Sequence, residues 1–277
     1  MSKFQQHLDS GAVMATSPRL WANPPGNSPL PLPSKPMFFT SAELSEMTLP
    51  DMPETDSLDL GGLKEYVGKF TLENGKMVKD VIDLEKRRPL LIVGELANPY
   101  RLCDIMAPDM PIIPVRLEGI CRTWADNLDA RDIQPGIHHV TLARSPGWWE
   151  RSFITLLELP DMKKLVAWLD GSLSNTWAPK RLAEGVIRLE SDMRLLPPKL
   201  EEISWDGIEE KVEVDIPEAN GPALDLSTIM VPINTRSGCY NSRGRVIRCA
   251  HYPQTEFHDN LFRRGSSFKW NQILDFL

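Results

Sequence analysis

The chain lacks the features that mark secreted, disulfide-stabilised or membrane-spanning proteins. Four cysteines in 277 residues are too few for a disulfide scaffold, so we expect reduced, half-buried thiols. The first residues contain no apolar segment of the kind found in a secretory signal, and we therefore predict a cytoplasmic location. The aliphatic runs, such as residues 90–93, are far shorter than the ~20 residues that cross a bilayer, which argues against membrane insertion.

The short motifs of common enzymes are also absent. The sequence contains no nucleophile elbow, phosphate-binding loop, dinucleotide-binding glycine motif, zinc-protease motif or calcium-binding loop. We therefore predict no cofactor and lean away from an enzyme. An unfamiliar site around His138 and His139 stays open as an alternative, in which one imidazole is a general base with Cys121 or Glu118. Adjacent residues on a strand point to opposite faces, so a structural role for each histidine is the favoured interpretation.

Proline is abundant at one end of the chain. Proline fixes its own φ, removes a hydrogen-bond donor and pushes the preceding residue toward extended backbone, so residues 29–33 favour polyproline II. We predict that residues 1–39 form an extended arm that adds little to the fold and binds a protein partner or a second copy. Seven prolines lie in this segment: Pro18, Pro24, Pro25, Pro29, Pro31, Pro33 and Pro36.

After the arm, residues 40–62 are predicted to form a short helix and a linker. Thr40 and Glu43 have the spacing of a capping box, which predicts a helix to about Met47. The polar, glycine-ended stretch at 51–62 is typical of a linker. The remaining residues, 63–277, are expected to form one α+β body.

The body is predicted to contain a mixed or mainly antiparallel sheet with a few packing helices. Residues 64–72 and 77–84 flank Asn74-Gly75, which indicates a hairpin with a type I′ turn. The aliphatic run at 89–93 is typical of a central strand covered on both faces. Apolar stripes at helical spacing predict helices over 160–171 and 179–196. Further strands are expected at 112–117, 137–142, 153–159, 212–216, 228–233 and 245–250.

The strongest metal hypothesis is a zinc site, but the spacing of its ligands is loose. Structural zinc normally uses ligand pairs that converge from a single turn. We therefore favour ordinary thiols and imidazoles over a metal site at the four candidate ligands, which are Cys239, Cys249, His251 and His258.

The net charge of −7 hides a contrast between two segments. Residues 201–218 carry eight acidic side chains and one lysine, whereas the tail, residues 235–277, carries seven cations and three acids interleaved with aromatic residues. Arginine and aromatic side chains are enriched in protein interfaces, and they also bind phosphates and stack on bases. Because the whole molecule is negative, we favour protein contact, with the acidic segment as a complementary patch in the same chain or on a copy.

These observations favour a non-enzymatic assembly or adaptor protein that acts through its arm and its basic-aromatic tail. A structural or accessory protein of a virus or phage has this profile. A nucleic-acid-binding protein that uses the tail is the second hypothesis. Trp148 and Trp149 follow a turn at Pro146-Gly147, and we expect that one of them meets a partner or is covered by a loop. The predicted partner-binding residues are Pro29, Pro31, Pro33, Trp148, Trp149, Arg263, Arg264, Phe268 and Trp270.

Overall fold

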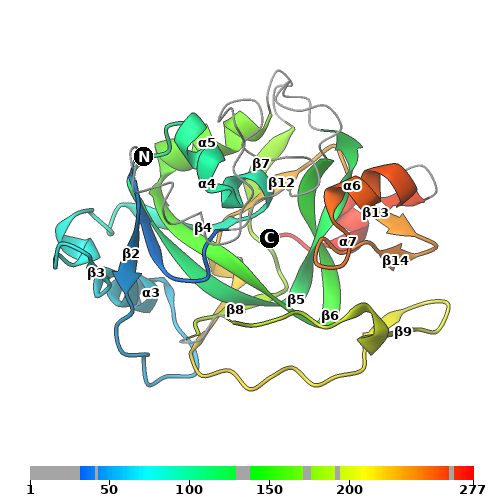
Figure 1. Cartoon of the computed structure of the whole chain (residues 1–277), viewed down its shortest axis with the longest axis horizontal. Helices are drawn as coiled ribbons and strands as arrows, with labels where there is room; N and C mark the ends of the chain where they lie inside the picture. Colours follow the sequence, from blue (N-terminus) through cyan, green and yellow to red (C-terminus); the bar gives the residue numbers. More distant parts are fainter. Residues whose placement is uncertain (1–31, 41–42, 129–137, 171–175, 191–193, 262–264) are drawn as a thin grey trace.

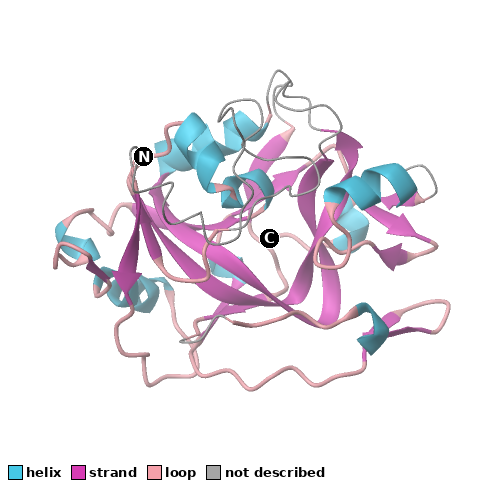
Figure 2. Ribbon diagram, in the orientation of Figure 1, coloured by secondary structure: helices cyan, strands magenta, loops and turns pink. Residues whose placement is uncertain are grey.

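The computed structural model describes residues 32–40, 43–128, 138–170, 176–190, 194–261 and 265–277. It consists mainly of antiparallel sheet, with short helices around the sheet (Figure 1, Figure 2). This confirms the α+β class and the mainly antiparallel sheet predicted from the sequence. None of the helices in the described ranges is long and apolar enough to cross a membrane.

The strands are β1 (Met37–Phe39), β2 (Leu44–Thr48), β3 (Thr71–Leu72), β4 (Arg87–Ile92), β5 (Met110–Leu128), β6 (His138–Glu158), β7 (Trp177–Lys180), β8 (Val186–Arg188), β9 (Ile203–Trp205), β10 (Glu210–Val212), β11 (Ala223–Asp225), β12 (Val231–Asn234), β13 (Cys239–Ser242), β14 (Arg245–Val246) and β15 (Ser266–Phe268). The α-helices are α3 (Leu60–Gly68), α4 (Pro99–Asp104), α5 (Leu159–Leu169), α6 (Gln254–Glu256) and α7 (Trp270–Ile273). Short turns of 3-10 helix are η2 (Val78–Asp80), η3 (Gly94–Ala97), η4 (Leu200–Glu202) and η5 (Leu226–Thr228), and η6 (Phe257–Leu261) is a π-helical turn.

The long strands β5 and β6 form the centre of the sheet. Strand β4 pairs with the other edge of β6, while β1 and β8 both pair with the edge of β5 that faces away from β6. Strand β1 covers β5 at residues 110–112 and β8 covers it at 116–118, so residues 113–115 lie between the two partners. This seam in the sheet positions a cleft beside the start of β1.

The hairpin of β5 and β6 is irregular near its middle. Glu118 pairs with Trp149, but Ile120 pairs with Arg144, so residues 145–148 lie opposite Gly119. Gly119 and Gly147 both have φ near +75°, a conformation that favours glycine. The sequence predicts two separate strands around Pro146-Gly147, and the structure instead has one long strand with a bulge at that point.

Side chains are buried on both faces of the sheet. Strand β4 sends Leu91 to one apolar cluster, which includes helix α3, and Leu90 to the other, which includes helix α5. The prediction that this strand is covered on both faces is confirmed. Helix α5 buries the stripe that its sequence predicts, which is Met162, Leu165, Val166 and Leu169.

Two predicted helices are wrong. Residues 44–48 form strand β2 rather than a helix, although Thr40 Oγ1 accepts a hydrogen bond from the Glu43 amide at 3.2 Å, as the capping box predicts. The described residues of the range 179–196 do not form a helix, because Pro179 lies in β7 and Gly185, with φ of +84°, breaks the stripe before β8.

The predicted hairpin at 64–84 is also wrong, since it is reduced to a short turn. Residues 60–68 are helical, and only Thr71 and Leu72 extend before the turn. Gly75 has φ of +81°, but Asn74 is not in the left-handed region, so the turn is not type I′.

Candidate functional site

The root of the arm is part of the body. Leu32 is 1% exposed, and β1 is paired on both sides, with β5 and β2, and fully buried. The predicted arm boundary at residue 39 is therefore wrong, because Leu32 and β1 belong to the core. Pro33 is half-buried in this root, whereas Pro29 and Pro31 lie outside the described residues.

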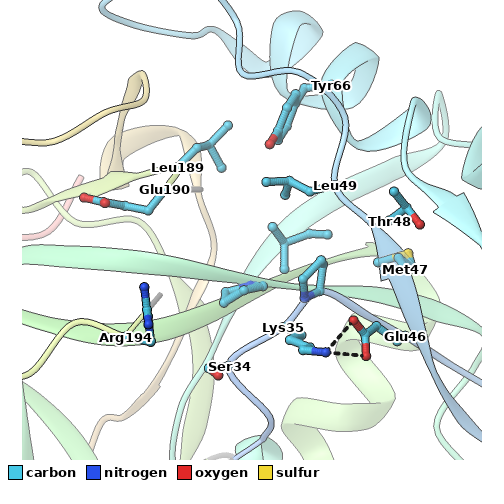
Figure 3. Close-up of a pocket in the computed structure, with 13 residues that line it drawn as sticks. Ser34, Lys35, Glu46, Met47, Thr48, Leu49, Tyr66, Leu189, Glu190 and Arg194 are labelled. Carbon is cyan, nitrogen blue, oxygen red and sulfur yellow. Dashed lines mark hydrogen bonds and ion pairs between the residues drawn. The ribbon is translucent and has the colours of Figure 1, made fainter. Parts of the chain in front are cut away.

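A cleft of about 480 Å³, which we call the seam cleft, opens beside this root (Figure 3). It lies where β1 and β8 leave β5 uncovered, and Ile113 and Pro114 of β5 line it. In Figure 3, Tyr66 of α3, Leu49 and Leu189 gather on one side of the cleft. Burial raises the pKa of the Tyr66 phenol to about 12.

Charged side chains at the seam cleft are already paired. Lys35 Nζ lies 2.8 Å from Glu46 Oε1, across the lower side of the cleft in Figure 3. The Glu190 side chain is 8% exposed, and its Oε1 lies 3.0 Å from Nε of Arg116, which is fully buried. This contact is close but poorly aligned for a hydrogen bond, and it is therefore an ion pair. The Arg116 guanidinium also pairs with Glu118 and donates to the carbonyl of Pro217.

The four zinc candidates do not assemble into a metal site. His251 Nε2 lies 2.8 Å from the carbonyl of Pro198, and His258 Nδ1 lies 2.9 Å from Nε2 of His138. Burial raises the pKa of Cys239 to about 12 and that of Cys249 well above its ordinary value, which disfavours the thiolate that binds zinc. Across the described parts of the chain, no three His, Cys, Asp or Glu side chains are grouped closely enough to hold a metal ion.

The alternative catalytic site also does not assemble. His138 is buried against Phe257, with ring centroids 4.8 Å apart, whereas His139 packs against Trp177 at 5.0 Å. These neighbours belong to different apolar clusters, in keeping with opposite faces of one strand. Burial raises the pKa of the Cys121 thiol to about 12. Glu118 is held by Arg116 and Arg188, so these residues do not form a nucleophile and base pair.

Both neighbouring tryptophans are buried within the chain. Trp148 is fully buried, and the guanidinium of Arg248 lies 4.9 Å from its ring centroid. Trp149 is 5% exposed, and its indole N–H donates to the carbonyl of Leu196 at 2.9 Å. The sequence left open whether one tryptophan meets a partner or is covered by a loop. In the structure, the segment around Leu196 covers Trp149. Neither side chain is exposed as a partner-binding surface in this chain.

Part of the basic tail is neutralised inside the chain. Glu210 of β10 lies 3.2 Å from Arg245 and 3.2 Å from Arg248, which joins the acidic segment to the tail. The predicted acidic strand at 212–216 is displaced, since β10 ends at Val212. The other predicted tail residues differ in their placement. Phe268 is half-buried and packs against the core, Arg263 and Arg264 lie outside the described residues, and Trp270 lies in α7.

A second cleft, of about 520 Å³, lies between the acidic segment and the tail. We call it the Trp205 cleft. Trp205 closes one side, and its ring packs on Gly244, where an added Cβ would lie 3.1 Å from Cη2. Tyr252 and Arg243 contribute further lining. Within the described ranges, the Trp205 indole N–H, the Tyr252 hydroxyl and the Arg243 guanidinium make no hydrogen bond or ion pair with another residue.

The residues of the Trp205 cleft were not predicted from the sequence as a site. In the sequence, Tyr252 and Arg243 stand out only as part of the tail composition, and Trp205 only as one of eight tryptophans. Trp205 is the one aromatic residue of the acidic segment, residues 201–218, and this was the available signal. A large aromatic residue in a charged segment needs an apolar neighbour, and the tail supplies it.

Comparisons with protein-family models, with curated proteins and with solved structures found no match for this chain. The geometry of the seam cleft, of the Trp205 cleft and of the root of the arm is therefore the basis for assigning a function.

Proposed function

We propose that this protein is a non-enzymatic assembly or adaptor protein that binds other protein chains through its proline-rich arm. The burial of Leu32 and β1 supports this proposal most directly. Because these residues are fixed in the sheet, the preceding 31 residues are tethered to a rigid point of the body. Proline-rich segments favour polyproline II, which presents its carbonyls and side chains to a partner without losing internal hydrogen bonds.

The two rival functions have less support. A nucleic-acid-binding tail needs free cations, but Arg245 and Arg248 both pair with Glu210. Glu210 brings the acidic segment against the tail, and the carboxylates of this segment repel phosphates. A catalytic site at His138, His139 and Cys121 needs these side chains to meet, and they are directed into different parts of the core.

The proposal is tested by measuring the molar mass of the full chain by light scattering over a wide concentration range. We expect the mass to rise with concentration above that of the 31.3 kDa monomer. A variant lacking residues 1–31 should remain a monomer at every concentration, because it keeps the body and loses the arm. Equal masses for the two proteins at all concentrations would contradict self-association through the arm.

A further inference from the structure

The Trp205 cleft has the chemistry that recognises a proline-rich segment. Its two aromatic side chains, Trp205 and Tyr252, each carry a donor that no other described residue uses. A polyproline II helix has no internal hydrogen bonds, so its backbone carbonyls need donors from a binding surface. Grooves that bind such helices are lined with aromatic rings, on which the proline rings pack.

Four apolar side chains also line the cleft, which suits the same ligand. They are Leu200, Val246, Ile247 and Leu261, and the other lining residues are Glu210, Ser242, Arg243 and Arg245. Leu200 is 41% exposed, and Ile208, at the turn between β9 and β10, is 82% exposed. Apolar side chains that remain exposed beside unpaired donors provide contacts that a proline- and leucine-rich segment can bury.

The charge beside the cleft favours a peptide over a nucleic acid. Of the two arginines of the lining, Arg245 is paired with Glu210, whereas Arg243 makes no ion pair with another described residue. Asp206 and Glu209 lie exposed at the neighbouring turn. Residues 18–31 of the arm carry one charged side chain, the cation Arg19. The carboxylates of Asp206 and Glu209 repel a polyanion that approaches the cleft, and an almost neutral, weakly cationic segment matches them better.

The root of the arm and this cleft lie toward opposite ends of the molecule. Strands β1 and β2 lie at one end of the long axis of the molecule, and β9 and β14 lie at the other end (Figure 1). A polyproline II segment rises about 3.1 Å per residue, so in the conformation that the sequence favours residues 24–32 would span about 25 Å and residues 18–32 about 43 Å. A folded chain of this length is about 50 Å across, and a path over its surface is longer still. This separation favours binding of residues 18–31 to the cleft of another molecule.

From these observations we infer that the Trp205 cleft of one copy binds residues 18–31 of a second copy. The inference rests on the proposed function, since it names the site that the arm occupies. The Trp205 N–H and the Tyr252 hydroxyl donate to arm carbonyls, and the proline rings pack on the two aromatic side chains. Arg19 faces Asp206 and Glu209 at the rim. Each copy offers one arm and one cleft, so the contact is head-to-tail.

The test separates the two halves of the contact in full-length chains. The arm variant carries Pro24→Ala, Pro25→Ala, Pro29→Ala and Pro31→Ala, and the cleft variant carries Trp205→Ala. We expect each variant alone to be a monomer by light scattering where the wild type associates. An equimolar mixture should form a 1:1 heterodimer and nothing larger, because only one functional arm and one functional cleft remain in each pair.

A direct measurement uses a fluorescein-labelled peptide of residues 18–31 and the arm variant as its receptor. We expect Trp205→Ala in the arm-variant background to weaken peptide binding at least tenfold, and Tyr252→Phe, which removes only a hydroxyl, to weaken it about threefold. Tyr252→Phe keeps the result interpretable if Trp205→Ala perturbs folding. Lys35→Ala, at the seam cleft, is the matched control and should leave the peptide affinity unchanged.

Each outcome decides a separate question. Arm-dependent association that Trp205→Ala and Tyr252→Phe leave intact would overturn this inference and leave the proposed function standing. Peptide binding at the cleft, with a full chain that stays monomeric at all concentrations, would assign the cleft to a different proline-rich protein and overturn the choice of a second copy. Loss of both arm-dependent association and peptide binding would overturn both proposals.

Discussion

The seam cleft and the Trp205 cleft have similar volumes, about 480 and 520 Å³, but their polar groups differ in availability. At the seam cleft, Lys35 is paired with Glu46, and Glu190 with Arg116. At the Trp205 cleft, the indole of Trp205 and the guanidinium of Arg243 have no partner among the residues that the structure describes. Charged groups that are paired with each other stabilise the sheet, whereas unpaired donors on a partly apolar surface favour binding of a ligand.

The largest loss of stability is expected when β1, the strand beside the seam cleft, is removed. Deleting residues 1–39 eliminates Leu32 and all of β1, whose buried side chains include Phe38 and Phe39. Losing one buried phenylalanine costs about 3–5 kcal/mol, so the whole deletion should exceed the total stability of a typical domain. We expect no cooperative unfolding transition in urea for this variant. Deletion of residues 1–31 is the control, and a comparable loss of stability in that variant would show that the arm itself is structural.

A smaller effect is expected for Arg116→Met, behind the same cleft. The substitution removes the cation that pairs with the buried Glu190 and the donor to the Pro217 carbonyl. Breaking a buried ion pair from one side costs about 3–5 kcal/mol, measurable by urea unfolding at neutral pH. Arg188→Met is the matched control, because Arg188 pairs with Glu118 but is 33% exposed, and it should cost about 1 kcal/mol or less. Equal losses would mean that burial does not set the value of these pairs.

The smallest effect concerns the pH dependence of the stability that His251 contributes beside the Trp205 cleft. His251 packs against Trp148 and lies 2.8 Å from the Pro198 carbonyl, two residues before Leu200 of the cleft. Burial lowers the pKa of His251, so the unfolded chain binds this proton more tightly than the folded chain does. The contribution of His251 is therefore present above pH 6.5 and decreases as the pH falls through the lowered folded-state pKa.

The pH effect is isolated by His251→Gln, which cannot be protonated in this range. Its free energy of unfolding at pH 8 should be lower by about 1 kcal/mol, the value of one hydrogen bond. Between pH 8 and 5 its stability should decrease less steeply than that of the wild type, as followed by urea unfolding at each pH. A steeper decrease in the variant would contradict a lowered pKa for His251.

The sequence predicted the parts of the fold that depend on local order. Helix α5 begins at a proline-containing first turn and buries its predicted stripe, because that stripe needs only one face to be covered. The helix predicted over 179–196 is wrong because its apolar residues also suit strands. Ile187 pairs with Leu117 and Leu224 on neighbouring strands, and this pairing favours strand β8 over a helix. Such pairings join residues far apart in the chain, and a single sequence does not contain them.

The candidate site was harder to predict than the fold. Charge contrast between residues 201–218 and the tail correctly suggested that the two segments attract each other, and Glu210 shows that they meet within one chain. The side chains left available by that contact could not be identified without the structure. Trp205 and Tyr252 are far apart in the chain and line one cleft because Glu210 of β10 binds residues in and around β14.

The position of β1 also determines how the protein carries mechanical load. The strand lies between β5 and β2 and is antiparallel to both, so a pull on the arm along the strand axis loads the two ladders in shear. In shear, the backbone hydrogen bonds of a ladder resist together, whereas peeling an edge strand breaks them one after another. A tether that enters the sheet between two strands therefore transmits tension to the centre of the body instead of to its margin.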